Sequence, residues 1–391
     1  LILKNPVHQA FFIFLFGILP PSIKISILGM EYGILFFLEM AFLYFGLKEK
    51  KIWAQILFPI LILFTRIDTV IFLGIVGLVD IFWNRKINWF FVLGGVLGVI
   101  SVVSFNWFYF GELVNNTIVA KSVTYAKNIS FNLQWKYFLL NYGNYWGMLK
   151  LPGDFNPFTI LVLIFEMVCF IYLVSKSKER NYFLWIIFLF AWAKQLVFIS
   201  QRSYFDWYYW VPQILLFSVV LVFILEQKTQ KILWISLLLI FYILPMMAFQ
   251  TIHSIATGNG EWNYRRSIGL FLKNYEKDKN QYILLEPAGY IPYFSGLKAI
   301  DEVGLVDKDI QKEIKKDKPN YWRNTAENRK PKYLLAPTDL FNGKDSVFYK
   351  NNYKLLKEFR IKDHLQSDNK ILEKIYRLKP SGTDYNLYEK K

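Results

Sequence analysis

The sequence predicts a polytopic α-helical membrane protein that ends in a small α/β domain outside the bilayer. Three observations predict this fold class. Residues of the hydrophobic set make up 54% of the chain. They gather in blocks of about 20 residues, which is the length of a helix that crosses a bilayer. Lysine and arginine collect in the short loops between these blocks, and after Ser254 the composition becomes that of a water-soluble domain.

The composition also excludes several classes of protein. The chain is far too apolar to be disordered. Three histidines and a single cysteine, Cys169, exclude a zinc-finger or disulfide-stapled framework. The net charge of +16 could indicate nucleic-acid binding. However, much of the basic excess lies in short loops between apolar blocks, where the positive-inside rule explains it.

Residues 1–254 form the predicted transmembrane domain. Its nine expected helices are 10–22, 31–47, 52–65, 68–83, 88–110, 157–174, 182–200, 208–225 and 232–250. The stretch 52–83 is divided in two because charged residues interrupt it at Thr65-Arg66-Ile67-Asp68. The fifth helix is followed by a long loop, 111–156.

The orientation of these helices follows from four basic loops. The loops lie at 48–51, 85–86, 176–180 and 228–231, and all fall on one side if every block crosses once. Because positive loops remain in the cytoplasm, the loop 111–156 and the C-terminal domain are expected on the other side. The sequence therefore predicts a protein of the cytoplasmic (inner) membrane with an extracytoplasmic C-terminal domain.

Residues 255–391 are predicted to be that soluble α/β domain. Tyr282–Glu286, Lys332–Ala336 and Tyr385–Tyr388 have the composition of short strands. Residues 262–275 have helical spacing of apolar side chains, and Lys308–Asn320 is a charged amphipathic segment.

Ionisable groups at membrane level are functional candidates because charge in lipid is costly. Glu31, Arg66, Asp68 and Asp206 all fall on the predicted outer side near the ends of helices. Arg66 and Asp68 are interpreted either as a structural pair in a tight turn or as a site where Arg66 faces a lipid phosphate.

Three further groups lie deeper in the apolar blocks. They are Glu39, Glu166 and Lys194. Glu166 and Lys194 are expected at similar depth on neighbouring antiparallel helices, so an ion pair between them is predicted. A proton relay is the alternative interpretation.

Aromatic side chains near the outer side form a second group of candidates. The run 204–210 includes Trp207, Tyr208 and Trp210, which suit either an interfacial belt or stacking against sugar rings. In the C-terminal domain, Tyr290 and Tyr293 are candidates for contact with a glycan. The domain itself is interpreted either as this binding module or as a lid that stabilises the helices.

Two segments of the transmembrane domain resemble motifs of the GT-C integral-membrane glycosyltransferases, in particular bacterial families related to the mycobacterial arabinofuranosyltransferases. Gly29-Met30-Glu31 is similar to the family's GMET helix start, with Tyr32 in place of threonine. Thr65-Arg66-Ile67-Asp68 is similar to the TRPD or TRPE turn, with Ile67 in place of proline.

Two later segments extend the resemblance to residue 307. YFGELVNNTIVAK at 109–121 resembles YYGxLxPNTxYAK, with Asn115 in place of proline. GYIPYFSG at 289–296 and IDEVGLVD at 300–307 resemble GxxPYxS followed by IDxxGLxD in the external C-terminal domain. The order and spacing of the four segments, rather than any single one, carry the resemblance.

The resemblance implies transfer of a sugar, usually with inversion, from a polyprenyl-phosphate donor to a glycan or lipid acceptor on the outer side. The residues matched to this chemistry are Arg66, Lys121 and Arg202 for the donor phosphate, Asn116 for donor positioning, and Glu31, Asp68 and Asp206 as candidate acids. The family's main acid follows its first helix, which places it upstream of Leu1. The activity of the chain from Leu1 onward therefore stays open. No cofactor and no protein metal site are expected, and the requirement for a divalent cation stays open.

Other classes of function remain as alternatives. They are another envelope polymerase or ligase that uses lipid-linked sugar, a membrane transporter, and a membrane-anchored binding protein. Transporters often contain two similar halves with interrupted helices, and this sequence has no such internal symmetry. A binding protein has no need of acids clustered at the membrane face.

Overall fold

A computed structural model describes residues 3, 5–19, 22–23, 31–113, 118, 120, 123–124, 135–136, 138–139, 157–176, 178–200, 206–226, 244–245, 247–286, 288–305 and 307–391. These residues divide into two compact units. The helical unit comprises 1–114 and 127–247, and the C-terminal unit comprises 115–126 and 248–391. The sheet unit therefore includes a short segment of the loop after the fifth predicted span.

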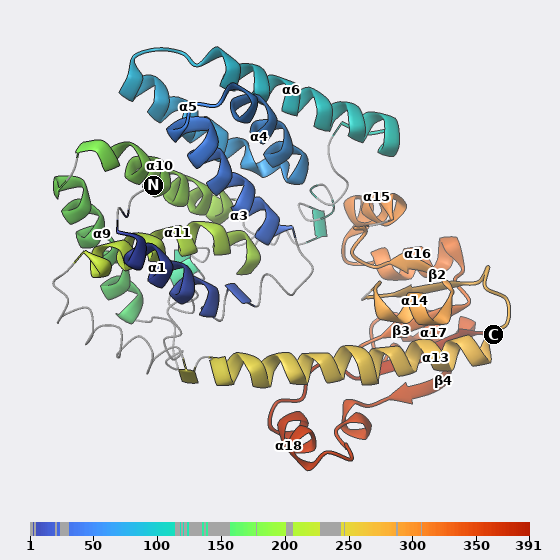
Figure 1. Cartoon of the computed structure of the whole chain (residues 1–391). Coiled ribbons are helices and arrows are strands. Elements are labelled where there is room, and N and C mark those ends of the chain that lie inside the picture. The colour runs from blue at the N-terminus through green and yellow to red at the C-terminus, as the bar shows by residue number, and fades with distance from the viewer. Residues whose placement is uncertain are drawn as a thin grey trace. The chain divides into compact units, whose positions relative to one another are not determined.

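The helical unit contains apolar helices in the predicted order (Figure 1). Their bounds are α1 Pro6–Ile18, α3 Tyr32–Ala41 with π-helical η1 Phe42–Lys48, α4 Ile52–Thr65, 3-10 turn η2 Ile67–Thr69, α5 Val70–Asn84, α6 Trp89–Phe105 with π-helical η3 Asn106–Phe110, α9 Pro157–Lys176, α10 Lys178–Ser200 and α11 Asp206–Leu225.

Five of the described helices are long and apolar enough to cross a membrane. They are 67–84, 89–110, 159–176, 181–200 and 208–225. Two shorter apolar helices, 6–17 and 52–65, accompany them. The chain is therefore a helical membrane protein. The count of nine spans stays a prediction, since most of 232–250 lies outside the described residues.

Close packing of α4 on α6 depends on two glycines spaced four residues apart. A Cβ on Gly94 would lie 2.7 Å from the carbonyl oxygens of Gln55 and Ile56, and a Cβ on Gly98 would lie 2.8 Å from Leu63. Glycine at both positions lets the two backbones approach, which is a common device where lipid supplies no hydrophobic driving force.

Polar and charged side chains gather at the ends of the helices. Asp80, near the C-terminus of α5, accepts bonds from Tyr182 (2.7 Å) at the start of α10 and from Asn84 (2.6 Å). The C-terminal ends of η1, α5 and α9 carry the basic residues Lys48, Arg85 and Lys176. The opposite ends of α4, α5 and α10 carry the ionic cluster described below.

The C-terminal unit is a mixed sheet with helices on both faces. Its elements are η5 Asn259–Arg265, α13 Arg266–Tyr275, β1 Tyr282–Leu285, α14 Tyr290–Ser295, β2 Lys298–Asp301, α15 Lys308–Asp317, α16 Tyr321–Arg329, β3 Tyr333–Ala336, α17 Ser346–Asn352, β4 Tyr353–Phe359, η6 Ile361–His364, α18 Lys370–Leu378 and β5 Tyr385–Lys390. Residues 247–275 form one continuous helix with η5 at its middle.

The strand order is β2-β1-β3-β5-β4. β1 pairs in parallel with β2 and β3, and β5 pairs antiparallel with β3 and β4. Alternate side chains of β1 enter different cores: Ile283 and Leu285 pack with α13 and α14, whereas Leu284 packs with α15 and α16. The three strands predicted from the sequence are thereby confirmed, and β2 and β4 are additions.

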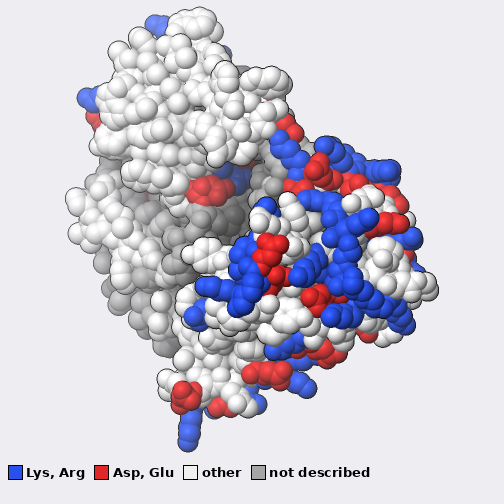
Figure 2. All heavy atoms as spheres, turned by 90° about the vertical axis from the view of Figure 1, so that its right-hand side faces the viewer, with Lys and Arg blue, Asp and Glu red and all other residues white. Residues whose placement is uncertain are grey.

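Charge is distributed as the composition indicates. In Figure 2, lysine, arginine and acidic side chains crowd the C-terminal unit, while the visible face of the helical unit is almost free of charge.

The predicted boundary at 254–255 falls inside the long helix 247–275.

Candidate functional site

An ionic cluster joins the first two segments of the resemblance. The Nη1 group of Arg66 donates to Oε1 of Glu31, and its Nε group donates to Oδ1 of Asp68 at 2.7 Å. The Nζ atom of Lys194, on α10, lies 3.7 Å from the other oxygen of Asp68. Residues more than 100 positions apart thus meet where α3 begins, α4 ends and α10 approaches its C-terminus.

Two aromatic rings fix the guanidinium of Arg66. Its Cζ atom lies 4.7 Å from the ring centre of Tyr32 and 5.3 Å from that of Tyr208. Cation–π contacts of this kind hold the planar group in one orientation. The side chains of Arg66 and Asp68 are 15% and 19% exposed, whereas Glu31 is 36% exposed and forms the open side of the cluster.

The turn that presents Arg66 is built by its neighbours in sequence. α4 ends at Thr65, and Arg66 adopts an extended conformation before η2 begins at Ile67. The buried hydroxyl of Thr69 donates to the backbone carbonyls of Ile62 and Arg66 and closes the turn. Ile67 occupies the first position of a helical turn, where proline is also favoured, so this departure from the family pattern is compatible with the same geometry.

The deeper charges differ from the prediction in one respect. Lys194 is fully buried and pairs with Asp68, so the predicted pair with Glu166 is wrong. Glu39 on α3 is also fully buried and interacts electrostatically with Lys194 and Asp68. The rotation of each helix about its axis decides which acid faces Lys194. Sequence position gives the depth of a residue in the membrane but not this rotation.

The other candidates of the helical unit divide into two groups. Tyr208 and Trp210 are buried, with Tyr208 stacked on Phe198 at 4.5 Å and Trp210 edge-on to Phe36 at 5.6 Å. Because protein side chains cover these rings, we no longer assign them to sugar stacking. The second group lies outside the described residues or side chains: Asn116, Lys121, Arg202, Asp206 and Trp207.

The chain just after the third segment of the resemblance meets the fourth segment in the C-terminal unit. Three residues after Lys121, the hydroxyl of Thr124 donates to the carbonyl of Val303 at 2.9 Å. Lys318 donates to the carbonyls of Val123 (3.0 Å) and Thr124 (2.9 Å). The chain after the third segment is thus anchored on the fourth.

The acids of the fourth segment shape its backbone. Asp301 accepts bonds from the amides of Val303 (3.1 Å) and Leu305 (2.6 Å). Gly304 has a φ of +75°, a conformation that favours glycine. Asp307 caps α15 and pairs with Arg329 at 2.6 Å. These residues therefore hold a turn and a helix start.

This turn lies at the carboxyl end of β2, next to the carboxyl end of β1. The connection after β1 enters α14 on one face of the sheet, and the connection after β2 enters α15 on the other. In open α/β sheets, ligands bind where adjacent connections diverge in this way. Glu302 lies at this place; its burial raises the pKa of its carboxyl group, and it accepts a bond from the hydroxyl of Tyr321 at 3.1 Å.

An exposed aromatic patch surrounds the predicted glycan-binding tyrosines. Tyr290 and Tyr293 are 37% and 81% exposed, and Trp262 beside them is 52% exposed. The ring of Trp262 lies 6.4 Å from that of Tyr290, and the guanidinium of Arg266 lies 4.5 Å over Trp262. Trp262 and Glu302 were not predicted as site residues from the sequence, although Trp262 opens the predicted helix 262–275 and Glu302 lies within the motif at 300–307.

Metal binding by protein side chains has no candidate in the described part of the chain. No group of three or more His, Cys, Asp or Glu side chains there is arranged to hold an ion. This statement covers the described residues alone.

One family model matches part of the C-terminal unit. A model described as "Domain of unknown function (DUF8728)" matches residues 251–388. Neither the curated proteins nor the solved structures gave a match. The matched residues cover the long helix after Gln250, strands β1 to β4, and β5 as far as Tyr388.

Proposed function

We propose that the protein is an integral-membrane glycosyltransferase of the GT-C type, which transfers a sugar from a polyprenyl-phosphate donor to a glycan or lipid acceptor. One observation carries the proposal. The first two segments that resemble this family come together in space, and the chain just after the third contacts the fourth. Glu31 of the first binds Arg66 of the second, and Thr124, just after the third, binds Val303 of the fourth.

The reaction exchanges one bond to the anomeric carbon of the sugar for another. The bond from this carbon to the phosphate oxygen breaks, and a bond to the acceptor oxygen forms. The acceptor hydroxyl gives its proton to a carboxylate, and the polyprenyl phosphate leaves as an anion. The site must therefore supply a base and a cationic or hydrogen-bonding group.

Arg66 suits the leaving phosphate. Its Nε and Nη1 groups bind Asp68 and Glu31, and no described residue binds Nη2, which we propose meets a phosphate oxygen. Guanidinium groups bind phosphate in fixed geometry, and the two rings already hold this one in place. Lys121, Arg202 and Asn116 remain proposed donor contacts.

Among the described acids, Glu31 is better placed than Asp68 to contact a substrate. Its side chain is 36% exposed, compared with 19% for Asp68, which is engaged by both Arg66 and Lys194. Asp206 stays a third candidate. We place the site on the outer side of the cytoplasmic membrane because the basic loops lie at the other ends of the helices.

The aromatic patch suits the acceptor. Tyr290 and Trp262 are partly exposed beside the carboxyl end of β1, and ligands of open α/β sheets bind at places where adjacent connections diverge in this way. A glycan presents flat C–H faces that stack on such rings. The patch and the ionic cluster would then handle acceptor and donor respectively.

The test is release of polyprenyl phosphate by the full chain in proteoliposomes. Synthetic polyprenyl-phosphate sugars are supplied with candidate acceptors, and the freed lipid phosphate is measured. Glu31→Gln is expected to lower release by at least about tenfold, since a positioned acid or base contributes about 10²–10⁴ in rate. Glu49→Gln is the matched control, because Glu49 is an exposed acid at the opposite end of the same helix.

Two results would contradict the proposal. The first is no release from any polyprenyl-phosphate sugar by a folded chain. The second is equal release from the Glu31 and Glu49 variants, which would remove Glu31 from the site. Substrate-dependent proton uptake without lipid-phosphate release would favour a transporter, for which the buried Glu39 and Lys194 are typical groups.

A further inference from the structure

Helix α18 presents an unusual face to its surroundings. Ile371 and Leu378 are 71% and 68% exposed, although both are large and apolar. They lie seven residues apart and therefore on the same side of the helix. Only Tyr376 among the residues of α18 is buried. Exposed apolar residues are common singly, but two on one short helix face call for an explanation.

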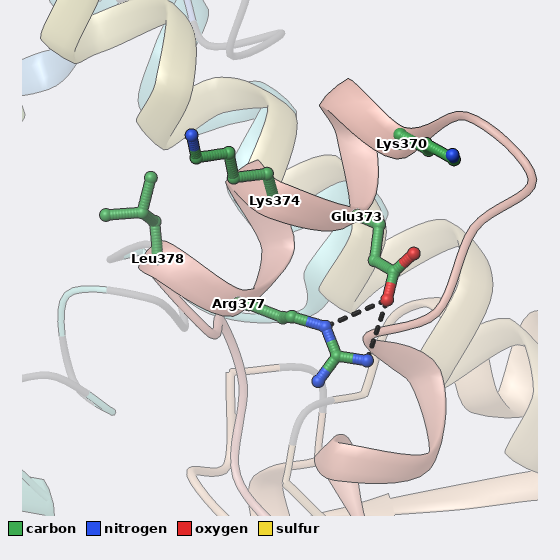
Figure 3. A pocket seen from close by; sticks show the side chains of 5 residues that line it. All are labelled: Lys370, Glu373, Lys374, Arg377 and Leu378. Carbon is green, nitrogen blue, oxygen red and sulfur yellow. Dashed lines mark hydrogen bonds and ion pairs between the residues drawn. The ribbon is translucent and has the colours of Figure 1, made fainter.

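Basic side chains border these apolar residues. Lys370, Lys374 and Arg377 recur at spacings of four and three residues and so form one stripe along the helix, and Leu378 lies beside it, four residues after Lys374. In Figure 3, Lys374 and Leu378 point to the same side of the helix. The one acid among them, Glu373, accepts bonds from Arg377 at 2.7 and 2.9 Å. Together with Glu373, these residues line a shallow hollow that is open to the surroundings. A mixed apolar and basic face is the pattern of helices that lie on an anionic lipid surface.

The fold ties α18 to the long helix that follows the last predicted span. Both flanks of α18 are tied to the long helix 247–275. Before α18, the carbonyl of His364 accepts a hydrogen bond from the side chain of Asn259 at 2.9 Å. After α18, the backbone of Ser381 packs closely on Gly260, and a Cβ on Gly260 would lie 2.4 Å from the carbonyl oxygen of Ser381.

The next basic residue in sequence reaches further toward the membrane. The ammonium group of Lys379 lies 4.6 Å over the ring of Phe249, which is 56% exposed. Phe249 belongs to the last predicted span, 232–250. The zone of polar headgroups begins where the hydrocarbon-spanning part of a helix ends. The contact of Lys379 with Phe249 therefore brings the C-terminal end of α18 to the level at which the predicted span ends.

We propose that α18 is an interfacial helix, whose exposed face rests on the anionic lipid surface of the protein's own membrane. Ile371 and Leu378 enter the boundary between headgroups and acyl chains, while Lys370, Lys374 and Arg377 contact lipid phosphates. This contact fixes the C-terminal unit against the bilayer at a second point, in addition to the long helix. The inference is independent of the proposed glycosyltransferase activity.

The test measures the depth of single labelled positions in the full chain. Ile371→Cys and Leu378→Cys are labelled with a fluorophore and reconstituted in vesicles that contain phosphatidylglycerol and brominated acyl chains. Val347→Cys is the matched control, since Val347 is 72% exposed on α17, which packs on the other face of the sheet. The native Cys169 is buried, and a Cys169→Ala background removes it.

We expect bromolipid to quench the labels at 371 and 378 several-fold more than the label at 347. Reversing three charges, with Lys370→Glu, Lys374→Glu and Arg377→Glu, should abolish most of that difference. Equal quenching at 371, 378 and 347 would overturn the proposal. So would labels that are shielded from a water-soluble quencher but not reached by bromolipid, because a protein would then cover the face. Quenching that is unchanged by the charge reversal would overturn the role of the anionic lipid.

Discussion

Replacing Arg66 by glutamine removes the cation that joins two carboxylates in the helical unit. The bond to Asp68 is short (2.7 Å) and both side chains are largely buried, so its loss costs about 2–3 kcal/mol. The bond to Glu31 contributes about 1 kcal/mol or less, because 36% of that side chain meets solvent. The two ring contacts add about 1 kcal/mol. The total, about 3–5 kcal/mol, matches the usual cost of removing one partner from a buried ion pair.

The assay is reversible unfolding of the purified full chain in detergent, followed by tryptophan fluorescence. Arg85→Gln is the control, since Arg85 is exposed at the other end of α5 and pairs with no acid among the described residues. Its loss should cost about 0.5 kcal/mol or less. Glu31→Gln should cost less in the Arg66→Gln background than alone, with a coupling of about 0.5–1 kcal/mol.

Two outcomes would refute this reasoning. If Arg66→Gln costs no more than Arg85→Gln, the cluster does not stabilise the bundle. If the effects of Arg66→Gln and Glu31→Gln simply add, the two residues do not interact as the geometry indicates.

Two further predictions address packing and pH. Gly94→Ala should destabilise the helical unit by about 1–3 kcal/mol, because its Cβ would meet the backbone oxygen of Ile56 at 2.7 Å. Gly95→Ala is the control and should be neutral or stabilising, because a Cβ there meets nothing within 4 Å. Equal thermal unfolding of the two variants would contradict the close approach of α4 and α6. Burial opposes the charge of Glu276, but bonds from Lys332 and other donors prevail and lower the pKa of its carboxyl group. Its stabilising effect should therefore be complete above the unfolded pKa of about 4.3 and disappear as pH falls through the lower folded value. Unfolding of Glu276→Gln and the parent at pH 7 and at acid pH measures this, and a gap that widens in acid would show the sign to be wrong.

The sequence predicts elements where the local pattern alone decides them. β1 and β3 are runs of aromatic and aliphatic residues, and β5 begins with two tyrosines and a leucine among its first four residues. Burial on both faces of the sheet explains why these strands are predictable from the sequence. β4 is an edge strand whose middle residues are mostly exposed, so its Lys-rich sequence carries little strand signal. β2 has only four residues, two of them charged.

The candidate site is predicted in part for a similar reason. Arg66 and Asp68 are two residues apart, so their pairing follows from the turn itself. The partner of Lys194 depends on helix rotation, which hydrophobic blocks do not encode, and the predicted choice of Glu166 was therefore wrong. The environment of Trp210 also depends on helix rotation. An aromatic residue near a helix end has the same sequence pattern whether it faces the core or the membrane interface.

The central claim is that the Glu31–Arg66–Asp68 cluster meets the phosphate of a polyprenyl lipid. Photo-crosslinking tests it most directly, with a polyprenyl phosphate that carries a diazirine beside its phosphate and with mass spectrometry of the labelled peptides from the reconstituted full chain. The account predicts labels in peptides that contain residues 29–32, 65–69 or 208, suppressed by excess unlabelled polyprenyl phosphate. Labels confined to the opposite ends of the helices, or labels that the competitor does not suppress, would contradict it.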